Sequence, residues 1–262
     1  MKKILLATVA ALGMASVASA ADLPARMPVK APPVIAPVFS WTGCYIGGYV
    51  GGAWSDGDIS AYDRNGYSAV GAWGYKTDAS FIGGGTLGCN YQPVGSPFVL
   101  GLEGELGYLN IKGSAYDPLL LNNAAVAPGV ASSTKIGNWY GIVAGRLGYS
   151  FDRALIYVKG GAAFVNVQNS VFDGFGLQTI NASASETVAT WTVGGGIEWA
   201  FDMNWSVKAE YMYIALNNQT VSGINPGDGL RYNWDHDNSG ISTAKIGLNY
   251  RFGGGAPLVA RY

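Results

Sequence analysis

The chain has 262 residues and a formal net charge of −1. Charged residues make up 13% of it, about half of the roughly 25% found in soluble globular domains, and 49% of it is hydrophobic. This composition excludes a disordered chain, and the absence of a basic excess argues against a nucleic-acid partner.

Residues 1–20 have the features of a cleaved export signal. Lys2 and Lys3 give a positive start, residues 4–17 form an uncharged apolar run, and Ala18-Ser19-Ala20 is a small-residue cleavage site. A membrane anchor is the alternative, but the run is shorter than the roughly 20 residues of a spanning helix. We therefore expect cleavage after Ala20.

Residues 21–40 are rich in proline and alanine. They contain Pro24, Pro28, Pro32, Pro33 and Pro37, a composition that favours extended polyproline-like chain over packed structure. We predict a flexible periplasmic tether, with a proline-rich peptide ligand as the alternative.

From residue 41 onward, apolar residues recur with a period of two, which predicts strands. In the clearest segment, Phe98, Leu100 and Leu102 alternate with polar-face positions that include Glu103 and Glu105. Eight such segments cover residues 41–54, 79–91, 98–111, 138–151, 154–166, 188–201, 204–216 and 242–252.

The connectors between these segments are alternately long and short. Short turns at one end and long loops at the other are typical of an up-and-down antiparallel barrel, and apolar-out, polar-in alternation is typical of the outer membrane. A barrel there must close, because hydrocarbon cannot satisfy an open sheet edge. We predict an all-β, eight-stranded antiparallel transmembrane β-barrel over residues 41–252, with both termini periplasmic and a C-terminal extension at 253–262.

The polar faces of the strands carry acidic and basic residues in nearly equal number. A soluble lipocalin-like or sandwich protein would turn such residues outward, where water requires no pairing. Near balance instead fits ion pairs that fill a narrow barrel, which has room only for its own side chains. The predicted lumen charge network comprises Glu103, Glu105, Arg146, Lys159, Glu198, Lys208, Glu210, Lys245 and Arg251.

Aromatic residues gather toward both ends of the predicted strands, as in the two interfacial belts of a membrane barrel. The belt at the turn end comprises Trp41, Tyr91, Tyr149, Phe151, Trp199, Phe201, Trp205, Tyr250 and Phe252. The belt at the loop end comprises Trp54, Tyr108, Trp139, Trp191 and Tyr213.

The chain contains two cysteines, Cys44 and Cys89. Aligning the first two strands across their loop places Ile46 opposite Leu87, and the same register places Cys44 opposite Cys89. We predict a cross-strand disulfide on the outer face, which closes a loop worth about 4 kcal/mol in the chain-entropy model. Two unpaired lipid-facing thiols are the alternative.

Several segments together resemble the small outer-membrane immunogenic (RopB-type) proteins of alphaproteobacteria. They are WTGCYIG at 41–47, GLEGE at 101–105, RLGYSFD at 146–152, WTVGGGIEW at 191–199, VKAEY at 207–211 and GLNYRF at 247–252. The resemblance implies an OmpA-like, surface-exposed barrel of a family often described as porin-like, with no agreed catalytic residues to carry over.

Nothing in the sequence indicates an enzyme, a cofactor or a metal centre. His236, within the last long loop, lacks a second histidine for a strong metal site, and we interpret it as a solvated loop tip. Glu103 and Glu105 could do acid–base chemistry or select cations, but packing against lumen cations is the favoured interpretation. An outer-membrane enzyme is therefore the least favoured function.

The favoured function is a structural outer-membrane protein that contributes to envelope integrity and presents four surface loops, and a small porin or solute channel is the alternative. Acidic residues outnumber basic ones in the predicted loops, which could bind divalent cations shared with lipopolysaccharide. We expect membrane lipid, lipopolysaccharide and the barrel-assembly machinery as partners. The machinery reads a terminal aromatic residue, for which Phe252 is favoured over Tyr262.

Overall fold

The computed structural model describes residues 39–63, 72–116, 131–173, 180–224, 229–238 and 240–252. All of them belong to one compact unit that spans residues 37–262. The predicted export signal, residues 21–38 of the predicted tether and the C-terminal extension lie outside the described residues. Within the described part of the chain, no helix is long and apolar enough to cross a membrane.

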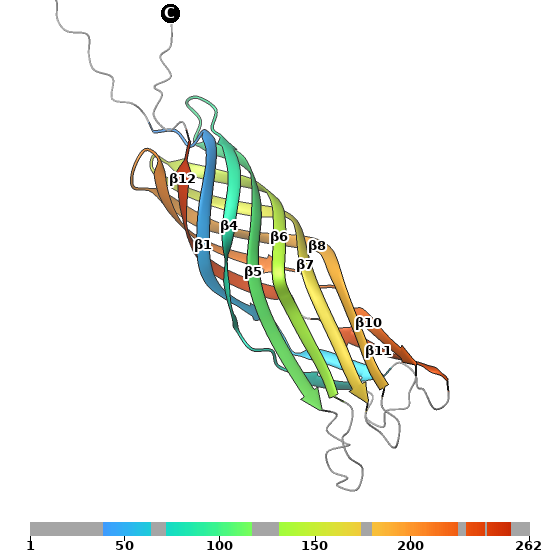
Figure 1. Ribbon diagram of the computed structural model, residues 1–262. Coiled ribbons are helices and arrows are strands. Elements are labelled where there is room, and N and C mark those ends of the chain that lie inside the picture. The colour runs from blue at the N-terminus through green and yellow to red at the C-terminus, as the bar shows by residue number, and fades with distance from the viewer. Residues whose placement is uncertain are drawn as a thin grey trace, which may run out of the picture. The chain divides into compact units, whose positions relative to one another are not determined.

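Eight antiparallel strands close into a barrel, in which the last strand pairs with the first (Figure 1). This confirms the predicted fold. The barrel strands are β1 (Gly43–Ser55), β4 (Ser80–Tyr91), β5 (Phe98–Tyr116), β6 (Ala131–Phe151), β7 (Ala154–Asp173), β8 (Ile180–Ala200), β9 (Trp205–Ile214) and β12 (Ile241–Arg251). We call the end with the short β4–β5, β6–β7 and β8–β9 connections the turn end, and the opposite end the loop end.

Four neighbouring strands run well past the predicted limits. β5, β6, β7 and β8 have 19, 21, 20 and 21 residues. Their alternation continues toward the loop end, because residues such as Val165, Val167 and Val171 still face a buried side. The prediction of a long loop between residues 166 and 188 is therefore wrong, since β7 and β8 stay paired as far as Asp173 and Ile180.

Two other predicted loops contain a second sheet instead of irregular chain. Its strands are β2 (Ile59–Asp63), β3 (Ala72–Tyr75), β10 (Gln219–Ile224) and β11 (Arg231–Asp237), in the order β10-β11-β2-β3. We call this the loop sheet. It packs on the prolonged part of β5–β8, where Ile59, Val221 and Trp234 share one core cluster with barrel residues such as Val167 and Val171.

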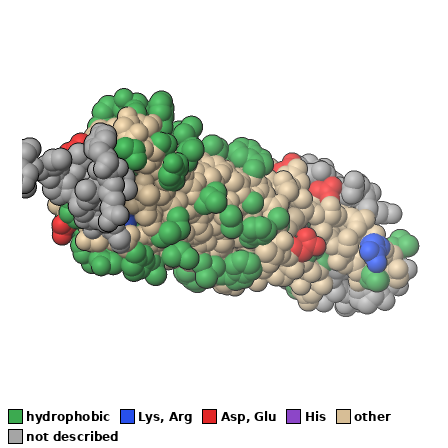
Figure 2. Space-filling model, turned by 90° about the horizontal axis from the view of Figure 1, so that it is seen from above, with side chains coloured by type: hydrophobic (Ala, Val, Ile, Leu, Met, Phe, Trp, Pro, Cys, Tyr) green, Lys and Arg blue, Asp and Glu red, His purple; other side chains and the backbone are tan. Residues whose placement is uncertain are grey.

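The apolar faces of the barrel strands point outward and the ionised ones point inward, as predicted. Leu102 is 70% exposed, whereas the next residue, Glu103, is 3% exposed. Hydrophobic side chains cover much of the wall in Figure 2, and the charged side chains visible there lie toward the two ends. A wall of this kind requires hydrocarbon as its surroundings, because water would leave a large apolar area exposed.

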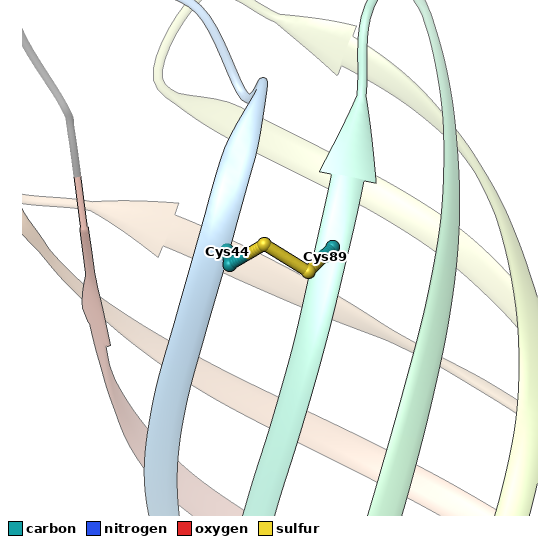
Figure 3. Close-up of a disulfide and its surroundings, with 2 residues drawn as sticks. All are labelled: Cys44 and Cys89. Carbon is teal, nitrogen blue, oxygen red and sulfur yellow. A yellow bond between two sulfur atoms is a disulfide. The ribbon is translucent and has the colours of Figure 1, made fainter.

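Cys44 on β1 and Cys89 on β4 are Cα partners and form a disulfide (Figure 3). The same register pairs Ile46 with Leu87, as predicted. The bond therefore joins two strands that are already neighbours in the barrel, near its turn end.

Candidate functional site

The lumen is filled by three successive groups of side chains. Nearest the turn end is a cap formed by residues 39–41 with Arg251, next comes the charge network, and beyond it lies an apolar layer that continues under the loop sheet. Each is built from inward-facing positions, so the period-two alternation of the strands delivers every member to the same interior.

Lys159 lies at the centre of the charge network. Its Nζ donates to Glu103 Oε1 at 2.7 Å, to Glu210 Oε1 at 2.9 Å and to Glu105 Oε2 at 3.3 Å. The Lys159 side chain is fully inaccessible to solvent. One ammonium group on β7 thus joins carboxylates from β5 and β9 across the barrel.

Two further lysines complete the pairing of these carboxylates. Lys245 Nζ lies 2.6 Å from Glu105 Oε1 and 3.1 Å from Glu210 Oε1, and Lys208 Nζ lies 3.3 Å from Glu103 Oε1. Three carboxylates therefore face three ammonium groups. Such balance is needed because an uncompensated charge in a water-poor interior costs several kcal/mol.

Arg146 and Glu198 form a second ion pair closer to the turn end, through Nη2 and Oε2. The other Glu198 oxygen accepts from Ser206 Oγ at 2.5 Å and from Asn249 Nδ2 at 2.8 Å. The Arg146 guanidinium also stacks on the Tyr157 ring, 3.6 Å from its centroid. Hydrogen bonds to the remaining lone pairs are what make a buried pair tolerable.

Inward-facing tyrosines, which the sequence analysis did not single out, donate further hydrogen bonds to the same carboxylates. Tyr45 donates to Glu103 Oε2, Tyr140 to Glu105 Oε1 at 2.7 Å and Tyr157 to Glu210 Oε2 at 2.9 Å. A signal was present for Tyr45, because it stands an odd number of residues from the outward-facing Cys44 and Ile46.

The structure brings eight of the nine predicted network residues into these contacts, and Arg251 differs. Its Nη1 donates to the Ser40 carbonyl at 3.0 Å and its Nη2 to the Met203 carbonyl at 2.9 Å. Its guanidinium lies 4.5 Å from the Phe39 ring centroid and 5.1 Å from that of Trp41. Arg251 therefore anchors the cap instead of an acidic partner.

Two residues of the cap were predicted to lie elsewhere: Trp41 in the aromatic belt and Phe39 in the tether. Trp41 is only 1% exposed, because it shares the inward phase of Tyr45, and its Nε1 donates to the Asp152 carbonyl at 3.1 Å. Phe39, placed in the tether by its proline-rich context, is buried against the barrel and meets Trp41 edge-on. The turn end of the lumen is closed by these two rings.

Beyond the charge network the lumen is apolar, which the prediction of a polar interior missed. Ile82, Leu109, Ile142 and Met212 are all fully or almost fully buried there. This layer is continuous with the core beneath the loop sheet, so the interior changes from ionic to hydrophobic toward the loop end.

His236 is part of this covered region, and its interpretation as a solvated loop tip is wrong. It lies on β11, is 0% exposed, and its Nε2 is 2.7 Å from Ser132 Oγ of β6. Burial lowers the pKa of His236 to about 4, an effect only partly opposed by the Trp234 carbonyl and Asp235. The loop sheet therefore holds a neutral imidazole against the barrel wall.

Comparison with known proteins places this barrel among its relatives. The sequence model for the outer membrane protein beta-barrel domain matches residues 7–252. The chain belongs to this outer-membrane β-barrel family. It is also 34% identical over 203 residues to the 31 kDa outer-membrane immunogenic proteins of Brucella melitensis biotype 1 and Brucella suis biovar 1, an alignment that covers 74% of this chain and 75% of each relative.

Among solved structures, the outer membrane protein OprG of Pseudomonas aeruginosa has a similar fold. The superposition has a TM-score of 0.50 with 13% sequence identity, and it covers 83% of this chain and 99% of OprG. At that identity the likeness concerns the fold alone. The family and the fold together assign this barrel to the outer membrane.

The carboxylates of this family member's lumen have the spacing of a cation site. One oxygen each from Glu103, Glu105 and Glu210 lie within 4.8 Å of one another. The Lys159 ammonium contacts all three residues, so the cation that they surround is a side chain of the barrel itself. The three carboxylates are therefore already paired with lysine side chains of the barrel.

Proposed function

We propose that this protein is a structural outer-membrane barrel with a closed lumen, which contributes to envelope integrity and presents its loop-end surface to the exterior. The observation that carries the proposal is the filled interior. The cap, the charge network and the apolar layer occupy the lumen in series, and a permeating ion would have to displace all three.

Each layer opposes permeation for a different physical reason. The charge network would have to exchange ion pairs for hydrated ions, because its lysines and glutamates already neutralise one another. The hydrocarbon side chains of the apolar layer, such as Ile82, Leu109 and Met212, cannot replace the water that an ion would lose there. At the loop end, the pairing of β2 with β11 joins the two halves of the loop sheet, which covers the apolar layer.

The first test of the proposal measures ion permeability. We expect purified protein in planar bilayers to give no steady conductance, while a large porin in the same preparation supplies the positive control. Steady single-channel steps from the wild-type protein would overturn the closed-lumen proposal and favour the alternative, a small porin.

A pair of variants shows whether the assay reports on the lumen. Shortening Lys159 and Glu210 together to alanine removes one positive and one negative charge from the network and leaves room for water. We expect this double variant to leak ions above the wild-type level. Leu102→Ala, which shortens a side chain that faces lipid, is expected to leave permeability unchanged.

A second measurement addresses the envelope role itself. Deleting the gene should increase sensitivity to detergent and to large antibiotics, and the closed wild-type barrel should restore resistance. Restoration by the leaking double variant only in part would link resistance to the filled lumen. Unchanged sensitivity in the deletion strain would contradict an envelope role without bearing on the barrel or its conductance.

Membrane lipid, lipopolysaccharide and the assembly machinery are the partners that this role requires. Phe252 follows the last strand and is 50% exposed, so an assembly factor could reach it at the turn end. Replacing Phe252 by alanine should slow membrane insertion more than removing Tyr262, if the strand end carries the signal.

A further inference from the structure

A polar pocket lies on the outer face of the barrel, where β5, β6 and β7 continue toward the loop end. It has a volume of about 520 Å³, and its lining combines three lysines with three serine hydroxyl groups. The lysines and serines concerned are Lys76, Lys112, Lys135, Ser114, Ser133 and Ser170. Ammonium and hydroxyl groups together are donors suited to the oxygens of an anion.

The three lysines of the pocket lie so close together that their positive charges repel one another unless an anion lies between them. Lys112 on β5 and Lys135 on β6 are direct Cα partners, and like charges in that position destabilise a sheet. Lys76 joins them because its neighbour Thr77 bridges to Gly113. None of the three forms an ion pair with another described residue.

Asp78 is the acidic residue that lines this pocket. Three positive charges and one negative charge therefore face the same cavity. The loop end as a whole is rich in acidic residues, so this concentration of lysines runs against its general character and marks one place on it for an anion.

The depth of the pocket matches the outer lipid headgroups. Tyr108 precedes Lys112 by four positions on β5, and Trp139 follows Lys135 by four on β6; both aromatic side chains are exposed. The four residues from Tyr108 to Lys112 on β5 span about 13 Å, or about 10 Å along the membrane normal at the usual strand tilt, and the bulge between Ile136 and Tyr140 makes the rise on β6 shorter. The lysines thus lie just outside the aromatic belt that marks the interface.

A second feature on the same wall lies on the membrane side of that belt. An apolar groove of about 680 Å³ runs over Gly104, Leu106, Gly141, Val143 and Phe164. These residues belong to β5, β6 and β7, the strands that also carry the lysine pocket, and the groove continues over Ile46, Gly47 and residues 85–87 of β1 and β4. Glycines leave the groove open, since they place no side chain on the outer face at those positions.

We propose that the outer wall of β5–β7 binds one phosphorylated glycolipid of the outer leaflet. Its phosphate is held by Lys76, Lys112 and Lys135, and one acyl chain lies in the groove over Gly104 and Gly141. Neither feature alone would select a lipid, but a phosphate site and an acyl groove that share β5, β6 and β7 match the two ends of one molecule. The proposal depends on the outer-membrane location and is independent of whether the lumen conducts.

The test uses the full mature chain in detergent and measures retained lipid by native mass spectrometry. The probes are bisphosphorylated lipid A, the same lipid without its phosphates, and inorganic phosphate as a competitor. We expect one bisphosphorylated lipid to be retained, and the dephosphorylated lipid to be retained at least about fivefold more weakly, since each lysine at a membrane surface is worth about fivefold in binding an anionic lipid.

Charge variants should move the affinity in opposite directions. Lys112→Gln and Lys135→Gln should each weaken retention about fivefold, and Asp78→Asn should strengthen it, because it removes the acidic group that opposes the phosphate. Arg231→Gln removes one positive charge from an exposed position on β11 outside the pocket, and it should leave retention unchanged.

A matched glycine pair tests the groove. Gly141→Leu fills the groove without a clash, since a Cβ there meets only ordinary contacts at 3.7 Å or more, and it should weaken retention. Gly52→Leu adds the same side chain to β1, where nothing lies within 4 Å of the added Cβ, and it should have no effect. Heat-modifiable gel migration confirms that each variant is folded before binding is measured.

Two outcomes would overturn the proposal. Equal retention by Lys112→Gln, Arg231→Gln and wild type would remove the lysine pocket as a site. Binding of inorganic phosphate that depends on the lysines, combined with lipid retention insensitive to Gly141→Leu, would assign the pocket to a free anion and exclude the lipid.

Discussion

Lys159 is the residue whose loss should affect stability most. In Lys159→Met the side-chain volume is nearly kept, but three buried carboxylates whose oxygens lie within 4.8 Å of one another retain only two lysines. Removing one member of a buried ion pair typically costs 3–5 kcal/mol, because the charge left behind is desolvated and unpaired. We expect the free energy of unfolding to fall by about 4 kcal/mol.

A second substitution separates this electrostatic effect from lost packing. Adding Glu210→Gln to Lys159→Met restores equal numbers of acidic and basic groups in this part of the network. If charge imbalance is the cause, the double variant should recover at least about 2 kcal/mol of the loss, since neutral replacement of a whole buried pair costs little.

The assay is urea unfolding of protein refolded into lipid vesicles, followed by tryptophan fluorescence and by the gel shift of the folded barrel. Arg231→Met is the control, because it also replaces a positive side chain by methionine, at an exposed position on β11, and should shift stability by less than about 0.5 kcal/mol. A loss below about 1 kcal/mol for Lys159→Met, or no recovery in the double variant, would refute this reasoning.

Three further predictions concern the disulfide, the buried histidine and the cap. Replacing Cys44 and Cys89 by serine should lower the free energy of unfolding by up to about 4 kcal/mol in the chain-entropy model, and non-reducing mass spectrometry that finds two free thiols in the wild type would contradict it. Because the pKa of His236 is about 4 in the folded protein and 6.5 when unfolded, its contribution to loop-sheet stability should be complete above pH 6.5 and be lost as pH falls toward 4, by about 3 kcal/mol in all. Hydrogen exchange of β11 should report this loss, and His236→Gln should abolish the pH dependence. Trp41→Ala should cost about 3 kcal/mol and expose residues near 39 to protease, whereas equal protease resistance would contradict a role for Trp41 in the cap.

The barrel strands and their pairing could be predicted because a strand in a membrane wall has one strictly apolar face. Alternation around Leu100 and Glu103 fixes which side meets lipid, and a slip of one residue would reverse it. The same register places Cys44 opposite Cys89 without any knowledge of the rest of the barrel. Local periodicity therefore suffices to predict a strand and its register where one face of the strand meets only lipid.

Where the surroundings of a strand change along its length, periodicity alone did not predict how far the strand extends. Past the bulge between Ile136 and Tyr140, the outer face of β6 meets water and the inner face meets the loop sheet. Small polar residues such as Ser133 are acceptable on the wet side, so the hydrophobic contrast that marked the membrane segment disappears. β6 continues because β5 and β7 continue beside it and pair with it. The sequence of β6 by itself does not reveal that pairing.

The loop sheet and the cap were missed because both depend on contacts distant in sequence. β2 has five residues and is held between β3 and β11, and β11 lies far from it in the sequence. Trp41 could have been assigned to the interior from its phase with Tyr45, but the belt pattern of the other aromatics favoured the lipid side. Likewise, the apolar character of Ile82 and Met212 gave no indication that the interior changes from charged to hydrophobic.

The construction of the loop sheet also determines what an antibody to this protein could recognise. Its strands come from two stretches of chain, 59–75 and 219–237, and β2 lies beside β11 only in the folded protein. An epitope that spans this seam is discontinuous, so antibodies raised against a peptide copied from either stretch should bind it poorly. Sequence drift in one stretch is in turn restrained by the other, because each supplies the edge on which its partner pairs.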